Sequence, residues 1–268
     1  MFSLLHNFLP QPIIWQSGLI KIHWYGIFIV LAILICLKLV LILAKKKNIN
    51  SDQVYDLAFY LILFGLIGGR IYAVLLEWQY YFDYPWEIVA VWHGGLAIHG
   101  AIIGSVITLI YYCLKHRQSF WFWGDILAVV LPLGQAIGRW GNYFNQELFG
   151  RPTNLPWGIP IELSNRPLNY LSAQYFHPVF LYESILNLIN FFILIWFYWH
   201  KDNFKLPPGR IMSVYLINYS IIRIVMEFLR LDDTPIVFGL RLPVAVSLMI
   251  IVVVAALWRF DTTKRSVL

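Results

Sequence analysis

The sequence is poor in charged residues and in cysteine. Only 13% of its 268 residues are charged and 60% are hydrophobic, whereas soluble domains average about 25% charged and about 45–50% apolar residues. A soluble chain of this composition would expose more apolar surface than water tolerates, and its low charge and many aromatic residues exclude a disordered chain. Two cysteines, Cys36 and Cys113, are too few for a disulfide scaffold or a thiolate zinc site. The composition therefore predicts an integral membrane protein.

Several chemical signatures are also missing. The sequence contains no H-E-x-x-H zinc motif and no serine or cysteine nucleophile elbow. The net charge of +6 is not gathered into a stripe of lysine and arginine interleaved with aromatic residues, which argues against nucleic acid as a partner. No internal repeat is visible, which disfavours the inverted-repeat transporters. We therefore expect no metal, no cofactor and no nucleic acid.

Long apolar stretches dominate what is present. A helix that crosses a membrane needs about 20 mostly apolar residues, and seven stretches qualify: Ile22–Ala44, Val54–Glu77, Gly94–Leu114, Phe120–Gly138, Pro178–Trp199, Ile211–Leu229 and Arg241–Trp258. The fourth is the weakest, because Asp125, Pro132 and several glycines interrupt it. The sequence predicts an all-α integral membrane protein, a seven-transmembrane-helix bundle that forms one domain over residues 1–268.

The basic residues predict how this bundle is oriented. Alternate loops and the C-terminal tail carry eleven of the twenty lysines and arginines: Lys45, Lys46, Lys47, Lys115, Arg117, Lys201, Lys205, Arg210, Arg259, Lys264 and Arg265. The first long loop on the opposite side, Glu77–His93, has none. Because lysine and arginine accumulate in cytoplasmic loops, we expect the N-terminus outside and the C-terminus in the cytoplasm.

The outer side is predicted to carry additional structure. Residues 139–177 form a loop too long for a simple connection, and we expect a small external head there, with short strands near Trp157–Glu162. The first twenty residues are expected to lie at the outer interface rather than to form a signal peptide, with these anchors: Phe2, Leu5, Phe8 and Trp15. The aromatic stretch Trp78–Trp86 is either a second interfacial arm or an ordinary aromatic belt.

Charged residues inside a membrane are costly and point to function by default. Five arginine and glutamate side chains fall in or near the outer halves of the predicted spans: Arg70, Arg139, Arg223, Glu227 and Arg230. The last three are spaced i, i+4, i+7, which predicts one helical face. A purely structural interpretation is a ladder in which Glu227 holds both neighbouring arginines. Glu183, in the fifth span, is expected to pair with one of the buried arginines.

The densest polar cluster lies where the fourth span emerges, in the run G-R-W-G-N-Y-F-N-Q-E-L-F-G-R from Gly138 to Arg151. Arginine presents a planar fork that matches phosphate oxygens. Asn142 and Asn145 add neutral donors, and Glu147 could orient an arginine or accept a proton. The alternative is a helix cap followed by a polar turn.

A third element is the run H-G-G-L-A-I-H-G from His93 to Gly100. We expect His99 to lie about one turn inside the outer interface, where burial keeps an imidazole neutral and therefore able to accept a proton. The alternative is a histidine that only packs against its neighbours.

Together these residues describe an arginine-rich pocket at the lipid level, suited to an anionic lipid headgroup. Because the chain supplies no nucleophile elbow, any nucleophile would come from a second substrate. Two other classes stay open from the residues alone: a binding or transport protein for an anionic solute, and a structural membrane module. A transferase differs from both in forming a covalent product.

Five motifs give the chain a specific resemblance. The run from Gly138 to Arg151 resembles the signature of the bacterial prolipoprotein diacylglyceryl transferases. H-G-G-L-A-I-H-G around His99, H-P-x-x-x-Y-E from His177, R-x-x-x-E-F-x-R from Arg223 to Arg230, and Trp24-Tyr25-Gly26 are similar to that family as well. The resemblance runs in order from the first span to the last and so covers nearly the whole chain.

The resemblance implies transfer of the diacylglyceryl group from phosphatidylglycerol to the lipobox cysteine of a prolipoprotein, the first step of bacterial lipoprotein maturation. The step forms a thioether, releases glycerol 1-phosphate and needs no cofactor. The implied partners are phosphatidylglycerol and prolipoprotein signal peptides, in the bacterial cytoplasmic (inner) membrane, with the active site toward the outer leaflet.

The resemblance also assigns residues. Arg139 and Arg223 would hold the lipid phosphate, and His99 would activate the thiol, unless the arginines lower the thiol pKa enough by themselves. The remaining residues are expected to shape the substrate site or support Arg223: Tyr25, Asn142, Glu147, Gly150, Glu227 and Arg230.

Overall fold

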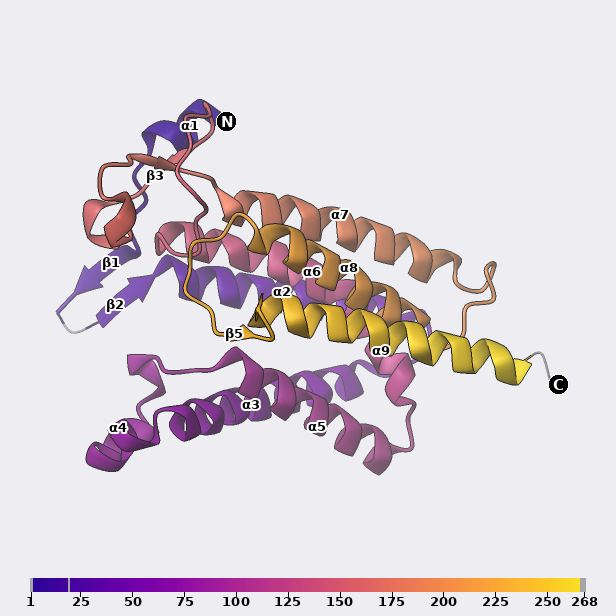
Figure 1. Cartoon of the computed structure of the whole chain (residues 1–268). Helices are drawn as coiled ribbons and strands as arrows, with labels where there is room; N and C mark the ends of the chain where they lie inside the picture. The colour runs from indigo at the N-terminus through magenta and orange to yellow at the C-terminus, as the bar shows by residue number, and fades with distance from the viewer. Residues whose placement is uncertain (1, 19, 266–268) are drawn as a thin grey trace. The chain divides into compact units, whose positions relative to one another are not determined.

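The computed structural model describes residues 2–18 and 20–265 (Figure 1). The chain divides into two compact units, and each is described here by itself. Unit 1 comprises residues 1–36 and 127–268, and unit 2 comprises residues 37–126. Two long helices, Trp24–Lys45 (α2) and Phe120–Phe144 (α6), contribute residues to both units.

The described residues are mostly helical. Besides α2 and α6, the α-helices are Phe2–Asn7 (α1), Ser51–Leu76 (α3), Trp78–Asp83 (α4), Ile98–His116 (α5), Val179–His200 (α7), Arg210–Glu227 (α8) and Leu242–Arg265 (α9). The 3₁₀ helices are Pro85–Ile88, Val91–His93, Leu163–Asn165 and Leu168–Tyr170. Three antiparallel strand pairs complete the fold: Ile13–Ser17 with Ile20–His23 (β1, β2), Ile159–Pro160 with Tyr175–Phe176 (β3, β4) and Ile236–Val237 with Leu240–Arg241 (β5, β6). The β3 strand lies within Trp157–Glu162, where short strands were expected, whereas the β1–β2 and β5–β6 pairs were not predicted.

Among the described residues, five helices are long and apolar enough to cross a membrane: α2, α3, α5, α6 and α7. This makes the chain a multi-pass membrane protein. The apolar part of α9, Leu242–Trp258, is shorter. α8 coincides with the sixth predicted stretch but carries Arg210, Arg223 and Glu227, which lower its apolar character.

Three of the helix ends that differ from the expected ones bear on the candidate site. α5 begins at Ile98 because Gly94 and Gly95 have φ values of +94° and +70°, which an α-helix does not accommodate. α6 continues past Gly138 to Phe144. α8 ends at Glu227, and the chain then turns so that Arg230 forms an isolated antiparallel bridge with Gly150. Residues 139–144 of the expected head are therefore part of α6.

Unit 1 is built on helices α6, α7, α8 and α9. α8 packs against both α7 and α9 (Figure 1). Polar contacts tie α6 to its neighbours: Ser184 Oγ donates to the carbonyl of Ala136 over 2.9 Å, and Gln135 Nε2 donates to Tyr215 Oη over 3.1 Å. Such hydrogen bonds help to fix helix positions in a membrane protein, where helix association cannot rely on the hydrophobic effect.

The head covers one end of unit 1 and has its own apolar core. That core consists of Leu5, Tyr143, Phe149, Ile159, Ile161, Phe176, Phe180 and Leu181. Leu5 is buried in this core, so its expected role as an interfacial anchor was wrong. Phe8 and Trp15 are exposed, and the side chain of Phe2 lies outside the described residues.

Unit 2 is organised by the close packing of α3 and α5, which lie side by side (Figure 1). A Cβ atom on Gly68 would fall 2.5 Å from the carbonyl oxygen of Gly100, and one on Gly104 would fall 2.5 Å from that of Phe64. Small residues at a helix interface allow such close approach of two backbones. We call this contact the glycine seam.

Candidate functional site

Seven charged side chains gather at one end of unit 1. At this end α6 and α8 end and α7 and α9 begin (Figure 1). We call them the ion-pair network: Arg139, Glu183, Arg223, Glu227, Arg230, Asp232 and Arg241. They come from positions up to about a hundred residues apart in the sequence, and the helix packing brings them together. Four arginines face three carboxylates, so the network has one more positive than negative charge.

Glu183, in the second turn of α7, is the hub of this network. Its carboxylate forms an ion pair with Nε of Arg139, lies 3.2 Å from Arg230 Nη1 and 4.0 Å from Arg223 Nη1. Its side chain is only 4% exposed. A buried carboxylate is tolerated when it is paired in this way. The expected pairing of Glu183 with a buried arginine is confirmed, and it involves three arginines.

Glu227 holds a different pair of arginines from the one expected. Its Oε2 lies 3.0 Å from Arg223 Nη2, one helical turn away, and its Oε1 lies 2.9 Å from Arg241 Nε. Arg230 is not its partner. Because α8 ends at Glu227, the i+7 position no longer lies on the helix face, and the predicted ladder stops there. Arg241, at the end of β6, is the second arginine that pairs with Glu227.

Arg230 instead pairs with Glu183 and with Asp232. Its Nε donates to Asp232 Oδ1 over 2.7 Å and its Nη2 to Oδ2 over 3.2 Å, which is the bidentate geometry that arginine favours. Burial alone would raise the pKa of Asp232, but the hydrogen bond and charge of Arg230 outweigh it and hold that pKa below its ordinary value. The Arg230 side chain is only 4% exposed, so this arginine is fully engaged within the protein.

Within the run from Gly138 to Arg151, hydrogen bonds of two asparagine side chains extend from Arg139 to Glu147. Arg139 Nη1 donates to Asn142 Oδ1 over 3.1 Å, and Asn142 Nδ2 donates to Glu147 Oε1 over 2.8 Å. Asn145 Nδ2 reaches the same Glu147 oxygen over 3.3 Å. Glu147 itself is exposed. The two asparagines thus fix a carboxylate at the rim of the network, and Asn142 is the link between that carboxylate and Arg139.

Gly150 allows three segments to meet beside the network. Its N–H donates to the carbonyl of His177 over 2.9 Å. A Cβ atom at this position would fall 2.8 Å from His177 Cβ and 3.0 Å from the carbonyl oxygen of Leu229. A side chain here would therefore push the start of α7 and the segment after α8 apart, and these two elements carry Glu183 and Arg230. Gly150 shapes the site through packing.

Tyr25, in the first turn of α2, packs on the same region. Its ring lies against Gly141 of α6, where an added Cβ atom would fall 2.5 Å from Tyr25 Cδ2. The side chain is 38% exposed. Two residues before Gly141, Arg139 leaves the same helix, so the tyrosine and the arginine lie at one end of unit 1.

The arginine side chains of the network differ in how exposed they are. The side chains of Arg139 and Arg223 are 25% and 16% exposed, against 4% for Arg230. Among the described residues, the second amino group of Arg139 has no hydrogen-bond acceptor, and the contact of Arg223 with Glu183 is long, at 4.0 Å. Arg139 and Arg223 are therefore positioned by the network and still have guanidinium surface for an anionic ligand.

His99 belongs to unit 2, in the first turn of α5. Its side chain is exposed within its own unit, so the other residues of unit 2 do not provide the expected burial. Its ring lies 6.0 Å from that of Tyr72 on α3. The imidazole is thus accessible and has an aromatic neighbour on the adjacent helix.

Comparison with known sequences identifies the family of the chain. Residues 12–260 match the family described as prolipoprotein diacylglyceryl transferase. Two similar proteins are phosphatidylglycerol–prolipoprotein diacylglyceryl transferases: one from Synechocystis sp., 46% identical over 84% of this chain and 80% of the relative, and one from Synechococcus elongatus, 41% identical over 96% and 90%. The chain belongs to the prolipoprotein diacylglyceryl transferase family.

Two residues of the ion-pair network were not predicted from the sequence. Arg241 and Asp232 complete the ion-pair network, although neither was among the predicted site residues. The sequence indicates Arg241 only as the start of the last predicted span, and an arginine at the end of an apolar stretch was the available signal. Asp232, two residues after Arg230, had no such signal, because its contact depends on how the chain turns after α8.

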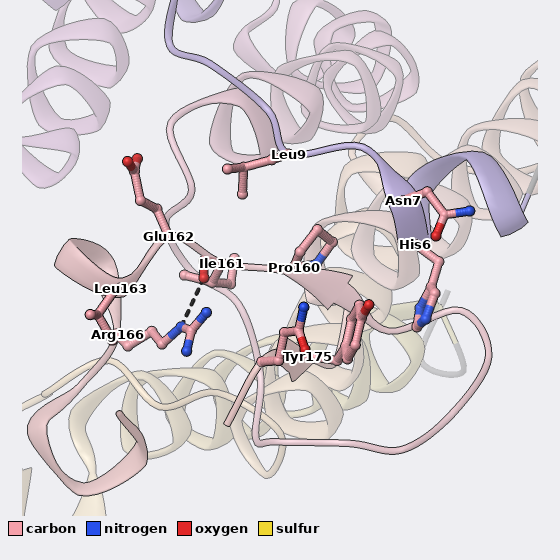
Figure 2. Close-up of a pocket in the computed structure, with 10 residues that line it drawn as sticks. His6, Asn7, Leu9, Pro160, Ile161, Glu162, Leu163, Arg166 and Tyr175 are labelled. Atoms are coloured by element: carbon pink, nitrogen blue, oxygen red, sulfur yellow. Dashed lines mark hydrogen bonds between the residues drawn. The ribbon is translucent and has the colours of Figure 1, made fainter. Parts of the chain in front are cut away.

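Two cavities of unit 1 lie at or near this end of the helices. One, of about 360 Å³, borders the ion-pair network and includes Arg151, Arg230 and Arg241 among its lining residues. The other, of about 420 Å³, lies in the head between α1 and the β3–β4 pair. Figure 2 shows Arg166 beside the second cavity, with Nε donating to the carbonyl of Ile161 over 2.8 Å. The second cavity shares no residue with the network.

Proposed function

We infer that this chain transfers the diacylglyceryl group of phosphatidylglycerol to the thiol of the lipobox cysteine in prolipoproteins, the first step of bacterial lipoprotein maturation. The C–O bond between the diacylglyceryl carbon and the phosphate breaks, a C–S thioether bond forms, and glycerol 1-phosphate leaves with the thiol proton. The observation that carries the assignment of the site is the pair of partly exposed arginines, Arg139 and Arg223, held by the shared buried carboxylate of Glu183.

Arg139 and Arg223 bind the phosphate and stabilise the anion that leaves. Negative charge on the phosphate grows as the C–O bond breaks, and preorganised guanidinium groups favour that charge more than the charge of the bound lipid. Glu183 orients both guanidinium groups before the lipid arrives. The single excess positive charge of the network favours an additional anion at this position.

The remaining residues shape or support this site. Tyr25, Asn142 and Glu147 form its rim. Gly150 allows the start of α7, which carries Glu183, to lie close to the segment after α8, which carries Arg230. Glu227 supports Arg223 directly. Arg230 supports Arg223 through Glu183, which both contact.

The incoming thiol must become a thiolate to react, because its ordinary pKa is about 8.5. We assign this activation to His99, whose imidazole is accessible within its unit. An arginine next to the thiol lowers the thiol pKa as well, and this is the competing route to the same thiolate.

In the membrane, we propose seven spans, with α8 and α9 joining the five long apolar helices. The N-terminus and the head lie outside and the C-terminus lies in the cytoplasm, because the basic residues gather at the opposite helix ends. The protein resides in the bacterial cytoplasmic (inner) membrane, and the ion-pair network faces the outer leaflet. The exposed side chains of Trp78, Phe82 and Trp86 suit an arm that lies in the interface.

A mass-shift assay tests the reaction. Purified protein in detergent is mixed with phosphatidylglycerol and a synthetic peptide that carries a lipobox cysteine. A matched peptide with serine at that position serves as the control. We expect a diacylglyceryl adduct on the cysteine peptide alone, with an equal amount of glycerol 1-phosphate. Lipid binding without an adduct would overturn the transferase and favour a lipid-binding or transport protein.

The role of His99 has its own test. We expect His99→Gln to lower the rate of transfer at pH 7 by about a hundredfold, the lower range of general base effects, while phosphatidylglycerol binding stays unchanged. The rate should recover at pH 9, where the thiol ionises without help. Wild-type turnover of the variant at pH 7 would remove His99 as the base and leave the arginines as the activating groups.

A further inference from the structure

Arg70, on α3, is a buried charge that the ion-pair network does not use. It belongs to unit 2 and is only 7% exposed. Its side chain donates hydrogen bonds to main-chain carbonyl groups of the segment that connects α4 to α5. A buried guanidinium group is stable only when its donors are satisfied, so its partners reveal what it holds in place.

Those partners are all main-chain carbonyl oxygens. Nε donates to Ile88 over 2.9 Å, and Nη1 donates to Gly94 over 2.6 Å and to Gly95 over 2.8 Å. Nη2 donates to Glu87 and, over 3.5 Å, to Ala90. Residues 87–95 are thus wrapped around one guanidinium group. We call this arrangement the Arg70 clasp.

Two further contacts complete the clasp. The guanidinium carbon lies 5.0 Å from the centre of the Tyr81 ring, within the range of a cation–π contact. Gly95 is required for the close approach, because its φ is +70° and an added Cβ atom would fall 2.5 Å from Arg70 Nη1 and 2.7 Å from Tyr81 Oη. A side chain at position 95 would therefore displace the guanidinium group.

The clasped segment leads directly into the helix turn that carries His99. Ala97 is the residue before α5, and its N–H donates to the carbonyl of Gly69 over 3.1 Å. Gly69 is the neighbour of Arg70 in the sequence. Adjacent residues of α3 therefore hold both the loop and the start of α5, and the His99 ring lies near Tyr72 of the same helix.

We propose that Arg70 is a positioning residue for the diacylglyceryl transfer reaction, which acts by holding the 87–97 segment so that His99 is presented in one orientation. The proposal rests on the proposed role of His99 as the base. A lysine could not replace the arginine, because one ammonium group with three N–H donors cannot reach five carbonyl oxygens spread over nine residues.

The clasp is tested first without reference to activity. Amide hydrogen exchange is measured on the whole protein and on Arg70→Gln, Arg70→Lys and Gly95→Ala. All three should exchange faster across residues 87–97 by about tenfold or more, while exchange in α7 and α8 stays unchanged. Unaltered exchange across residues 87–97 in Arg70→Gln would overturn the clasp itself.

Kinetics then test the link to His99. Arg70→Gln should lower kcat at pH 7 by about tenfold or more, leave the KM for phosphatidylglycerol unchanged, and regain most of the rate at pH 9. The double variant Arg70→Gln/His99→Gln should be no slower than His99→Gln alone, because two residues that act as one unit are not additive. A role through His99 would be contradicted if the rate losses of the two single variants multiplied in the double variant. It would also be contradicted if the loss in Arg70→Gln did not depend on pH.

The outcomes separate the two proposals. If the wild type forms no adduct, the proposed function fails while hydrogen exchange still decides the clasp. If His99→Gln is fully active at pH 7 and Arg70→Gln is slow, the base assignment fails and so does positioning of His99 by Arg70. Faster exchange with full activity in Arg70→Gln would also overturn the positioning role and leave a structural clasp alone.

Discussion

Glu183 and Glu227 each hold more than one arginine, and this sharing explains how so many charges coexist at one end of unit 1. Removing one partner of a buried ion pair is costly when it leaves the other charge unpaired. Here Glu183 keeps two arginines if a third is removed, and Glu227 keeps Arg241 if Arg223 is removed. The network can therefore lose Arg139 or Arg223 without leaving an isolated carboxylate.

His177 gives a prediction of pH dependence at the residue scale. Burial lowers the pKa of His177 below its ordinary value of about 6.5. The unfolded chain then binds more protons than the folded one between the two pKa values, so stability is present above pH 6.5 and is lost as the pH falls. We expect the Tm in detergent to fall between pH 7 and pH 5, and His177→Gln to flatten that part of the curve. An identical slope in the variant would contradict this.

The sequence predicted most members of the ion-pair network better than their contacts. Arg139, Arg223 and Glu183 stood out because charges are rare in apolar stretches, and spacing on one helix correctly paired Arg223 with Glu227. The Arg230 partner was mispredicted because helical spacing applies only up to the helix end at Glu227. The Glu227–Arg241 contact links residues on different elements, and no local pattern encodes that pairing.

At the scale of elements, the glycine seam between α3 and α5 fixes the helix pair that carries both Arg70 and His99. The length of the apolar stretches predicted both helices, but the glycines did not indicate which helix packs against them. That information lies in the packing, since the same residues would suit any close helix contact.

The seam predicts a loss of stability on a minimal change. Gly68→Ala places a Cβ atom 2.5 Å from a backbone carbonyl oxygen, so α3 and α5 must move apart, at a cost of about 1–3 kcal/mol. Gly26→Ala is the control, because no atom lies within 4 Å of its added Cβ. Thermal unfolding in detergent should show a lower Tm for Gly68→Ala only. Equal Tm values would mean that the seam is not tightly packed.

At the scale of the whole molecule, loop charge predicts the orientation of the chain in the membrane. Ser164 lies in the head and Ser51 at the start of α3, and both are exposed. In a chain with Cys36 and Cys113 replaced by alanine, we expect a membrane-impermeant maleimide to label Ser164→Cys on intact spheroplasts and to label Ser51→Cys only after lysis. The reverse pattern would invert the topology.

The central claim is that Arg139 and Arg223 bind the lipid phosphate and stabilise the leaving anion. The most direct test is the single-turnover rate of diacylglyceryl transfer to the lipobox peptide, measured for Arg139→Ala, Arg223→Ala and Lys21→Ala. Lys21→Ala is the matched control because it removes one positive charge from an exposed position in strand β2. We predict losses of about 10²–10³-fold for the two arginine variants, with folded protein and a near-normal rate for the control. A wild-type rate in either arginine variant would contradict its role at the phosphate.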